Sequence, residues 1–144
     1  MVISTNKRAH FDYEILETYE AGVQLKGYEV RAVRLGQINI SGSYVIIRKN
    51  EAWLINVDIP PYQPQNTPSN YEQRRTRRLL LKKSEIKSLA GKLQEKGLTL
   101  LPLRVYTKNR NLKLLVGLGR ARKKKDKRDL LKRREAEREM KTFQ

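Results

Sequence analysis

The feature that most constrains this chain is a series of short segments in which apolar and polar side chains alternate. The clearest is residues 112–118, where Leu112, Leu114, Val116 and Leu118 recur with a period of two. That period predicts a β-strand with one face in an apolar core. Similar runs occupy residues 13–19, which we expect to end near Gly22, and residues 43–48, 52–57 and 98–107. The sequence therefore predicts a mainly β chain of roughly five to seven short strands.

Four of these runs form two predicted hairpins. Residues 43–48 and 52–57 meet at residues 49–51, and residues 98–107 and 112–118 meet across residues 108–111. In the first hairpin we expect Trp53, Ile55 and Val57 to share one face. Short antiparallel strands in a small domain favour a closed or partly closed barrel, because closure removes exposed edges. We expect an oligonucleotide-binding-type barrel, with an open α+β sheet as the alternative.

Two helices are predicted beside the strands. Residues 29–35 indicate a short helix that presents Arg31 and Arg34 on one face. Residues 84–96 indicate a longer helix, with Ser84 as its N-cap and Gly97 just past its end. Between the hairpins, residues 59–78 hold prolines and polar residues typical of a long irregular loop. It ends in a basic cluster, residues 74–78, which we expect to be exposed before a buried strand or helix.

The charge of the chain points to its partner. Its 144 residues carry 32 Lys and Arg against 15 Asp and Glu, a formal net charge of +17. Such an excess repels itself unless a polyanion screens it, and nucleic acid is the leading candidate, ahead of an anionic membrane surface. Residues 120–144 hold twelve Lys and Arg and five acids, a net of +7. We therefore predict an RNA-binding barrel domain over residues 1–119 and a basic tail over residues 120–144.

The tail has helix-forming residues but no apolar stripe, since Leu130, Leu131, Met140 and Phe143 do not line one face. A helix that is polar all round is marginal in water. We expect this tail to be disordered when free and helical on a negatively charged surface.

Catalysis finds little support in the sequence. The chain has one histidine, His10, and no cysteine, so we expect no catalytic site, no metal and no cofactor. Asp12 and Glu14 lie two apart, and on a strand they would share a face and form a weak Mg²⁺ candidate, but a solvent-exposed face explains them better. No apolar run approaches the length of a membrane span, and residues 1–5 lack the apolar core of a signal peptide. We expect a cytoplasmic protein with no membrane partner and no small-molecule substrate.

Several side chains suit RNA contact. Asn6, Lys7 and Arg8 and the cluster at residues 74–78 offer phosphate contacts. Tyr13, Tyr19, Tyr28, Tyr44 and Tyr71 could each stack on a base or fill the core, and only Tyr71 lies in a polar loop. Glu20 either accepts a hydrogen bond from the amino group of a base or caps backbone N–H groups nearby.

The ordered motifs of the chain resemble the SmpB (small protein B) family over about residues 6–128. They are Asn6-Lys7-Arg8-Ala9, Asp12-Tyr13, Tyr19-Glu20-Ala21-Gly22-Val23, Glu29-Val30-Arg31, Ser43-Tyr44-Val45, Arg77-Arg78-Leu79-Leu80-Leu81, Gly97-Leu98-Thr99 and Asp126-Lys127-Arg128. No single segment is decisive, but all of them in this order and spacing are very specific.

The resemblance implies a barrel that grips the tRNA-like part of transfer-messenger RNA and a tail that becomes helical in the messenger channel of a stalled ribosome, at its decoding centre. The protein would then serve trans-translation, the rescue and tagging reaction. The expected RNA-binding residues are Asn6, Lys7, Arg8, Tyr13, Glu20, Arg31, Arg34, Arg74, Arg77, Arg78, Leu80 and Lys82. The expected ribosome-binding residues of the tail are Arg122, Lys123, Lys124, Asp126, Lys127 and Arg128.

The sequence departs from the family pattern at a few positions. Relatives usually have His where Phe11 stands, and Asp-Pro where Glu72-Gln73 stands. Relatives also typically place Gly at Ala121 and an aromatic residue or His at Lys125. The alternative function is that of a basic ribosomal or ribosome-assembly protein that binds RNA.

Overall fold

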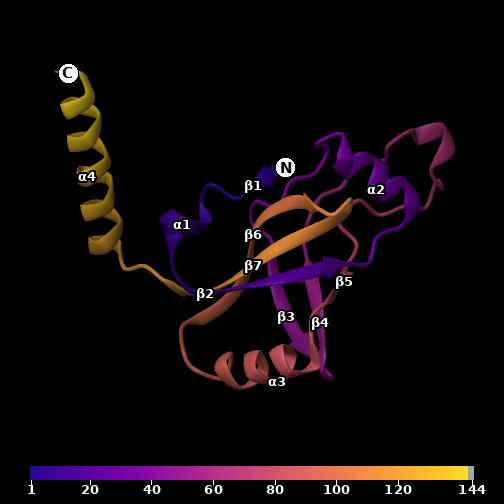
Figure 1. The fold of residues 1–144 in the computed structure, drawn as a ribbon, viewed down its shortest axis with the longest axis horizontal. Helices are drawn as coiled ribbons and strands as arrows, with labels where there is room; N and C mark the ends of the chain where they lie inside the picture. The colour runs from indigo at the N-terminus through magenta and orange to yellow at the C-terminus, as the bar shows by residue number, and fades with distance from the viewer. Residues whose placement is uncertain (143–144) are drawn as a thin grey trace.

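The fold is one antiparallel sheet that closes into a barrel-like ring (Figure 1). The structure is a computed structural model, and it describes residues 1–142. Its strands are β1 (Val2–Thr5), β2 (Tyr13–Val23), β3 (Tyr44–Arg48), β4 (Glu51–Ile55), β5 (Arg77–Leu80), β6 (Leu98–Lys108) and β7 (Asn111–Ala121). Neighbouring strands follow the order β1-β6-β3-β4-β5-β2-β7, and a further pairing of β6 with β7 closes the ring. The expected barrel is therefore confirmed, and the open sheet is not what forms.

The interior of the ring is filled by the side chains that the period of two predicted. On β7, Leu114, Val116 and Leu118 are almost completely buried. They pack with Ala21 of β2 and Leu100 of β6 in one apolar cluster. Each of these side chains alternates with one that faces outward, so the same register that fills the core also sets which residues the barrel presents to a partner.

Both hairpins turn through two residues in left-handed conformation. Lys49 and Asn50 have φ of 51° and 61°, and Asn109 and Arg110 have φ of 51° and 68°. Two successive residues with positive φ form the turn whose twist matches that of the flanking strands. Beyond the first hairpin, Asn56 has a φ of 68° and ends β4. The expectation that Val57 shares a face with Trp53 and Ile55 is therefore wrong.

The helices are α1 (Ala9–Asp12), α2 (Gly27–Arg34), α3 (Lys83–Lys92) and α4 (Lys124–Thr142), with a short 3₁₀ turn over Pro64–Asn66. Helix α3 begins one residue earlier than predicted, because the Lys82 N–H donates to Oε1 of Glu85 (3.1 Å), and Ser84 is not its cap. It ends at Lys92, and Gly97 (φ 88°) lies beyond a further turn. Within residues 1–142, none of these helices is long and apolar enough to span a membrane.

A second, smaller apolar layer lies outside the ring. Ala9 of α1 packs with Leu101 and Leu103 of β6, and Tyr13, Ile15 and Leu115 adjoin them. Gly117 makes this layer possible, because a Cβ there would lie 2.8 Å from Cδ1 of Leu103. The segment before β2 is thereby held flat against the barrel exterior.

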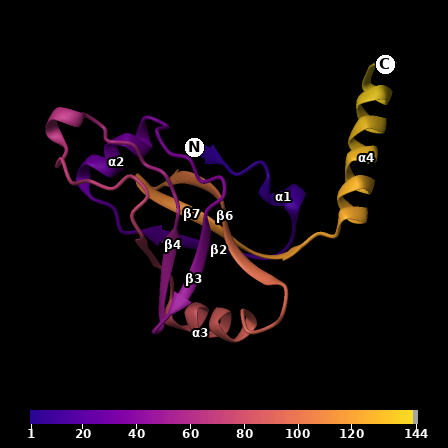
Figure 2. The same ribbon diagram turned by 180° about the vertical axis from the view of Figure 1, so that it is seen from behind.

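The tail begins later than predicted. Strand β7 continues through Ala121, which pairs with Tyr13 of β2, so residues 120 and 121 belong to the barrel. Helix α4 then stands apart from the barrel, beyond α1, in both views (Figure 1 and Figure 2). Phe143 lies outside the described residues.

Candidate nucleic-acid interface

The segment that leads into α1 exposes two of the predicted cations and buries its asparagine. The Asn6 N–H donates to the Leu103 carbonyl (2.7 Å), and its side-chain Nδ2 donates to the Pro102 carbonyl (3.0 Å). Only 5% of Asn6 is exposed, whereas Lys7 and Arg8 lie at the surface. Asn6 is therefore an anchor that aims Lys7 and Arg8 outward, and its expected contact with RNA stays a prediction.

A hollow of about 350 Å³ opens beside this segment. Its wall combines a guanidinium group, from Arg8, with two aromatic rings, from Tyr13 and Tyr44. Tyr44 is 44% exposed. Arginine and tyrosine together suit a phosphate and an unpaired base. Asp12 also lines this hollow and pairs with Arg8, so a phosphate there would compete with this carboxylate.

A polar cluster covers the outer face of β2, β7 and β6. Glu20 of β2 accepts a hydrogen bond from the Tyr106 hydroxyl of β6, and Lys108 Nζ lies 3.3 Å from its other oxygen. Arg104 lies over the Tyr106 ring, with its guanidinium carbon 5.8 Å from the ring centre. Glu20 therefore binds side chains of this face and does not cap local backbone in the structure.

The ionisation of this cluster is fixed by its own hydrogen bonds. The bond from Tyr106 and the neighbouring Lys108 hold the pKa of Glu20 below its usual value. Burial and the bond to Glu20 raise the pKa of Tyr106 to about 12. Near neutral pH the pair is thus a carboxylate and a protonated phenol, which fixes the orientation of the ring.

The predicted basic cluster at residues 74–78 is divided between surface and interior. Strand β5 alternates, so Arg77 and Leu79 point into the barrel while Arg78 and Leu80 point outward. Arg77 is fully buried, so the prediction that it contacts RNA is wrong. Arg74, Arg78, Leu80 and Lys82 are exposed, and Leu80 also covers Gly22 of β2.

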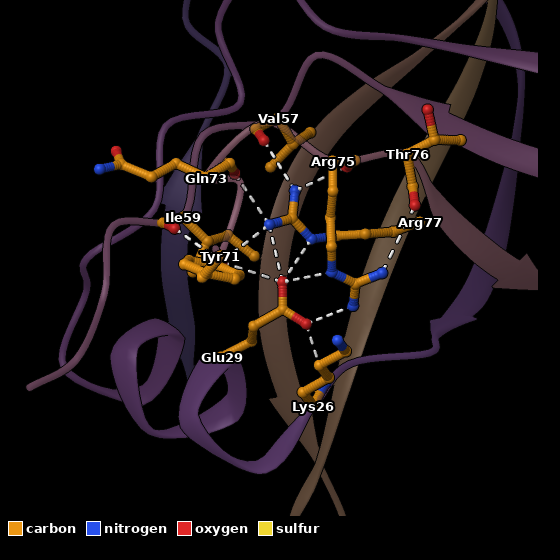
Figure 3. Close-up of polar contacts among 9 residues, drawn as sticks. All are labelled: Lys26, Glu29, Val57, Ile59, Tyr71, Gln73, Arg75, Thr76 and Arg77. Atoms are coloured by element: carbon orange, nitrogen blue, oxygen red, sulfur yellow. Dashed lines mark hydrogen bonds and ion pairs between the residues drawn. The ribbon is translucent and has the colours of Figure 1, made fainter. Parts of the chain in front are cut away.

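Arg77 is held by a buried network centred on Glu29 (Figure 3). Its Nε donates to Oε2 of Glu29 (2.8 Å), and its other nitrogens donate to the carbonyls of Val57 and Gln73 (2.8 Å each). Arg75 also pairs with Glu29. The Tyr71 hydroxyl lies 3.1 Å from Glu29 Oε2, so this tyrosine serves the network and is not a free stacking platform.

This network joins α2 to the long loop that precedes β5. Burial alone would raise the pKa of Glu29, but hydrogen bonds from Arg75, the Lys26 N–H and Arg77 bring it below its usual value. The carboxylate is therefore ionised and neutralises guanidinium charge that would otherwise be buried alone. On the outer side of α2, Arg31 and Arg34 are exposed as predicted, and Arg34 donates to the Arg110 carbonyl (2.7 Å).

The start of the tail is fastened to α1. The Arg122 N–H donates to the Asp12 carbonyl (2.9 Å), and Lys127 Nζ lies 3.1 Å from Asp12 Oδ1. Arg8, Lys127 and Arg134 each place a cation within 6 Å of the Phe11 ring centre. The other predicted tail residues, Lys123, Lys124, Asp126 and Arg128, are exposed.

Asp12 and Glu14 do not form the weak Mg²⁺ pair considered from the sequence. Asp12 is the last residue of α1, whereas Glu14 lies in β2, so the two do not alternate along one strand. Asp12 instead pairs with Lys127 and Arg8. In residues 1–142 no group of three or more His, Asp or Glu side chains could hold a metal ion.

Sequence reasoning missed part of the exposed basic face. Arg104, Tyr106, Lys108 and Lys113 were not predicted as contacts, although all lie on β6 or β7 beside Glu20. For Arg104 the signal was available in the alternation, because it lies between the buried Leu103 and Val105. Together with Lys7, Arg8, Arg78 and Lys82, the four missed residues give a barrel whose exterior is basic and carries aromatic rings, which defines the class as that of nucleic-acid-binding β-barrels.

Comparison with known proteins narrows the class to one family. The family model described as SmpB protein matches residues 3–144, and the chain belongs to the SmpB family. It is 50% identical to the SsrA-binding protein of Gloeothece citriformis and 48% identical to that of Synechocystis sp., over 139 residues in each case. Both alignments cover 96% of this chain and 90% of the relative.

A solved structure agrees with these relatives. It is described as "tmRNA-SmpB: a journey to the center of the bacterial ribosome", and its matching chain is 46% identical. The TM-score is 0.69, and the match covers 84% of this chain and 85% of that chain. The resemblance expected from the ordered motifs is therefore confirmed.

Proposed function

We propose that this protein binds the tRNA-like domain of transfer-messenger RNA and delivers it to stalled ribosomes for trans-translation. The observation that carries this proposal is the 50% identity to an SsrA-binding protein across 96% of the chain. The protein acts as a binding module and forms no covalent bond itself. Because its partner is the ribosome, it works in the cytoplasm.

The contact residues follow from what the barrel exposes. Lys7, Arg8, Arg78 and Lys82 are exposed cations that reach phosphates, and Leu80, 52% exposed, offers an apolar contact. Glu20 contributes to the contact surface together with the Tyr106 ring, whose orientation its carboxylate fixes by accepting the hydrogen bond from the hydroxyl. Asn6 and Arg77 contribute indirectly, because Asn6 anchors the segment before α1 and Arg77 anchors the start of β5.

The tail supplies the second surface. Arg122, Lys123, Lys124, Asp126, Lys127 and Arg128 lie at or near the start of α4, away from the β5 face. We propose that they contact the ribosome in the messenger channel near the decoding centre. We propose that the tail is largely disordered in the free protein, with only its first turns held at α1, and that it takes its full helix on the ribosome.

The test is the binding of a labelled tRNA-like fragment across a series of salt concentrations. Arg78→Ala should weaken binding and reduce the slope of log affinity against log salt by about one, the value for one lost phosphate contact. Lys132→Ala, an exposed cation far along α4, is the matched control and should leave both unchanged. Fragment affinity no better than that for an unrelated RNA of equal length would contradict the proposed function.

A further inference from the structure

The outer face of the β3–β4 hairpin carries a hollow. Of the expected RNA-binding residues, Arg78 alone adjoins it. Trp53, the single tryptophan of the chain, lines it together with Ile46 and Ile55, and it opens over about 350 Å³. Trp53 lies opposite Ile46 on β3 and opposite Arg78 on β5. These side chains point away from the core, because Ala52 and Leu54 occupy the inward positions of β4.

The rim of this hollow is cationic. Arg48 and Lys49 line it, and Glu51, the acid among its lining residues, pairs with Arg78 at 3.3 Å. Beyond the hairpin turn, Lys83 and Lys87 of α3 line a second hollow of about 560 Å³. In residues 1–142, no carboxylate pairs with Arg48, Lys49, Lys83 or Lys87. Figure 2 shows this end of the hairpin beside α3.

Aromatic and cationic groups lie near one another along one outer face of the hairpin. From its open end to its turn, the outward cross-strand pairs are Tyr44 with Ile55, Ile46 with Trp53, and Arg48 with Glu51. The exposed Tyr44 also lines the hollow beside Arg8, so the track joins that hollow to the lysines of α3. A ring that can stack on a base, set between cations that can reach phosphates, is the pattern of single-stranded nucleic-acid binding.

We propose that Trp53 stacks on an unpaired nucleotide of the same RNA that Arg78, Leu80 and Lys82 contact, with Arg48 and Lys49 on its flanking phosphates. The proposal rests on the proposed function for the identity of that RNA. Charge favours RNA over a protein partner, because the one carboxylate of the hollow is already neutralised by Arg78. The hollow is continuous with the proposed contact surface for transfer-messenger RNA, because Arg78 lies beside Trp53 and also on the outward face of β5. This continuity favours transfer-messenger RNA over ribosomal RNA.

The single tryptophan makes the test direct. Binding of the tRNA-like fragment is followed by anisotropy of a dye on the RNA, and the fluorescence of Trp53 is recorded in the same titration. Stacking should quench Trp53 with the same half-saturation as the anisotropy change. Trp53→Ala should weaken binding by roughly 5- to 150-fold, the range measured for the loss of one stacked base. Trp53→Phe, which keeps a ring, should bind nearly as the wild type does.

Leu35→Ala is the matched control, because Leu35 is an exposed apolar side chain at the end of α2 and outside the hollow. It should bind like the wild type. Anisotropy that saturates while Trp53 fluorescence stays constant would overturn the stacking and leave the proposed function intact. Absence of fragment binding would instead contradict the function. Quenching by purified ribosomal subunits but not by the fragment would assign the hollow to another partner and overturn the proposal.

Discussion

At the scale of single residues, Glu29 is the side chain on which most of the buried polar structure depends. Its carboxylate accepts hydrogen bonds from the side chains of Arg75 and Arg77 and from the backbone N–H of Lys26. The side chains of Glu29 and Arg77 are both fully buried. Removal of one partner from a buried ion pair leaves the other charge without compensation. The network therefore makes both the orientation of α2 and the start of β5 sensitive to one carboxylate.

Glu29→Gln should lower the free energy of unfolding by about 3–5 kcal/mol, because Arg77 would remain charged and buried. Urea unfolding followed by circular dichroism measures this change. Glu72→Gln, which alters an exposed carboxylate on the loop that carries Arg75, should stay within about 0.5 kcal/mol of the wild type. Equal stability of the two variants would show that the network does not stabilise the fold.

The effect of Glu29 should also depend on pH. Its pKa in the folded state lies below the ordinary value of 4.5, so its ionised form stabilises the fold. That contribution is fully present above the unfolded-state pKa and is lost as the pH falls through the folded-state pKa. The difference in unfolding free energy between wild type and Glu29→Gln should shrink as the pH drops from about 6 to about 3. A constant difference across this range would contradict the assignment.

The sequence could have separated Arg77 from Arg78, but it could not have identified the partner of Arg77. In residues 77–80 the alternation puts Arg77 on the same face as Leu79, and this signal was available. Its partner Glu29 lies 48 residues earlier on a helix, and only the closed barrel brings the two together. The anchoring role of Asn6 was missed for the same reason, since its partner Pro102 is 96 residues away.

At the scale of elements, the contact between α1 and α4 links the RNA-binding segment to the tail. Asp12 pairs with Arg8, the residue that precedes α1 (3.5 Å), and with Lys127 on α4 (3.1 Å). Both pairs are partly exposed to solvent, so each contributes modestly to stability. The contact is therefore weak enough for a polyanion at Arg8 or Lys127 to displace Asp12.

Asp12→Asn should loosen α4 from α1 without weakening the barrel. Amide hydrogen exchange over residues 124–134 should become up to about fivefold faster, as expected for an exposed pair worth up to about 1 kcal/mol. The free energy of unfolding of the barrel should change by less than about 0.5 kcal/mol. Asp129→Asn, on an exposed position of α4, is the control. Equal exchange in both variants would show that Asp12 does not hold the tail.

The strands with strong alternation were predicted well, and the elements without it were not. Strand β1 was missed, because Val2–Thr5 is short and pairs only with the outer edge of β6. The four-residue helix α1 was missed too, and its residues 9–12 lack a repeating pattern. The start of α3 was predicted wrongly, because the Glu85 side chain accepts a hydrogen bond from the N–H of Lys82, a residue type that does not mark a helix start in the sequence.

At the scale of the whole molecule, the net charge of +17 is divided between the barrel and the tail, for which we propose separate tasks. The barrel exposes cations on its outer strands, and α4, which stands apart from the barrel in Figure 1, carries others. The sequence predicted this division from the count of charges, but it placed the boundary at residue 119, inside β7. The position of the last strand residue depends on pairing with β2 and β6, which composition does not report.

Truncation after Lys123 should separate the two tasks. The shortened protein keeps β7 and the bond from the Arg122 N–H to Asp12, so the barrel should stay folded and bind the tRNA-like fragment nearly as well as the full chain. Peptide tagging on stalled ribosomes should be abolished, because the tail contacts would be lost. Loss of fragment binding in a folded truncated protein would show that the tail is part of the same RNA site.

The central claim, that this basic barrel serves one RNA, is tested most directly by sequencing the RNA that copurifies with the full chain from cells of its own source. The account predicts one dominant species, transfer-messenger RNA, which should be depleted when Arg78 and Lys82 are both replaced by alanine. Recovery of ribosomal RNA alone would contradict the account and would favour a basic ribosomal or ribosome-assembly protein.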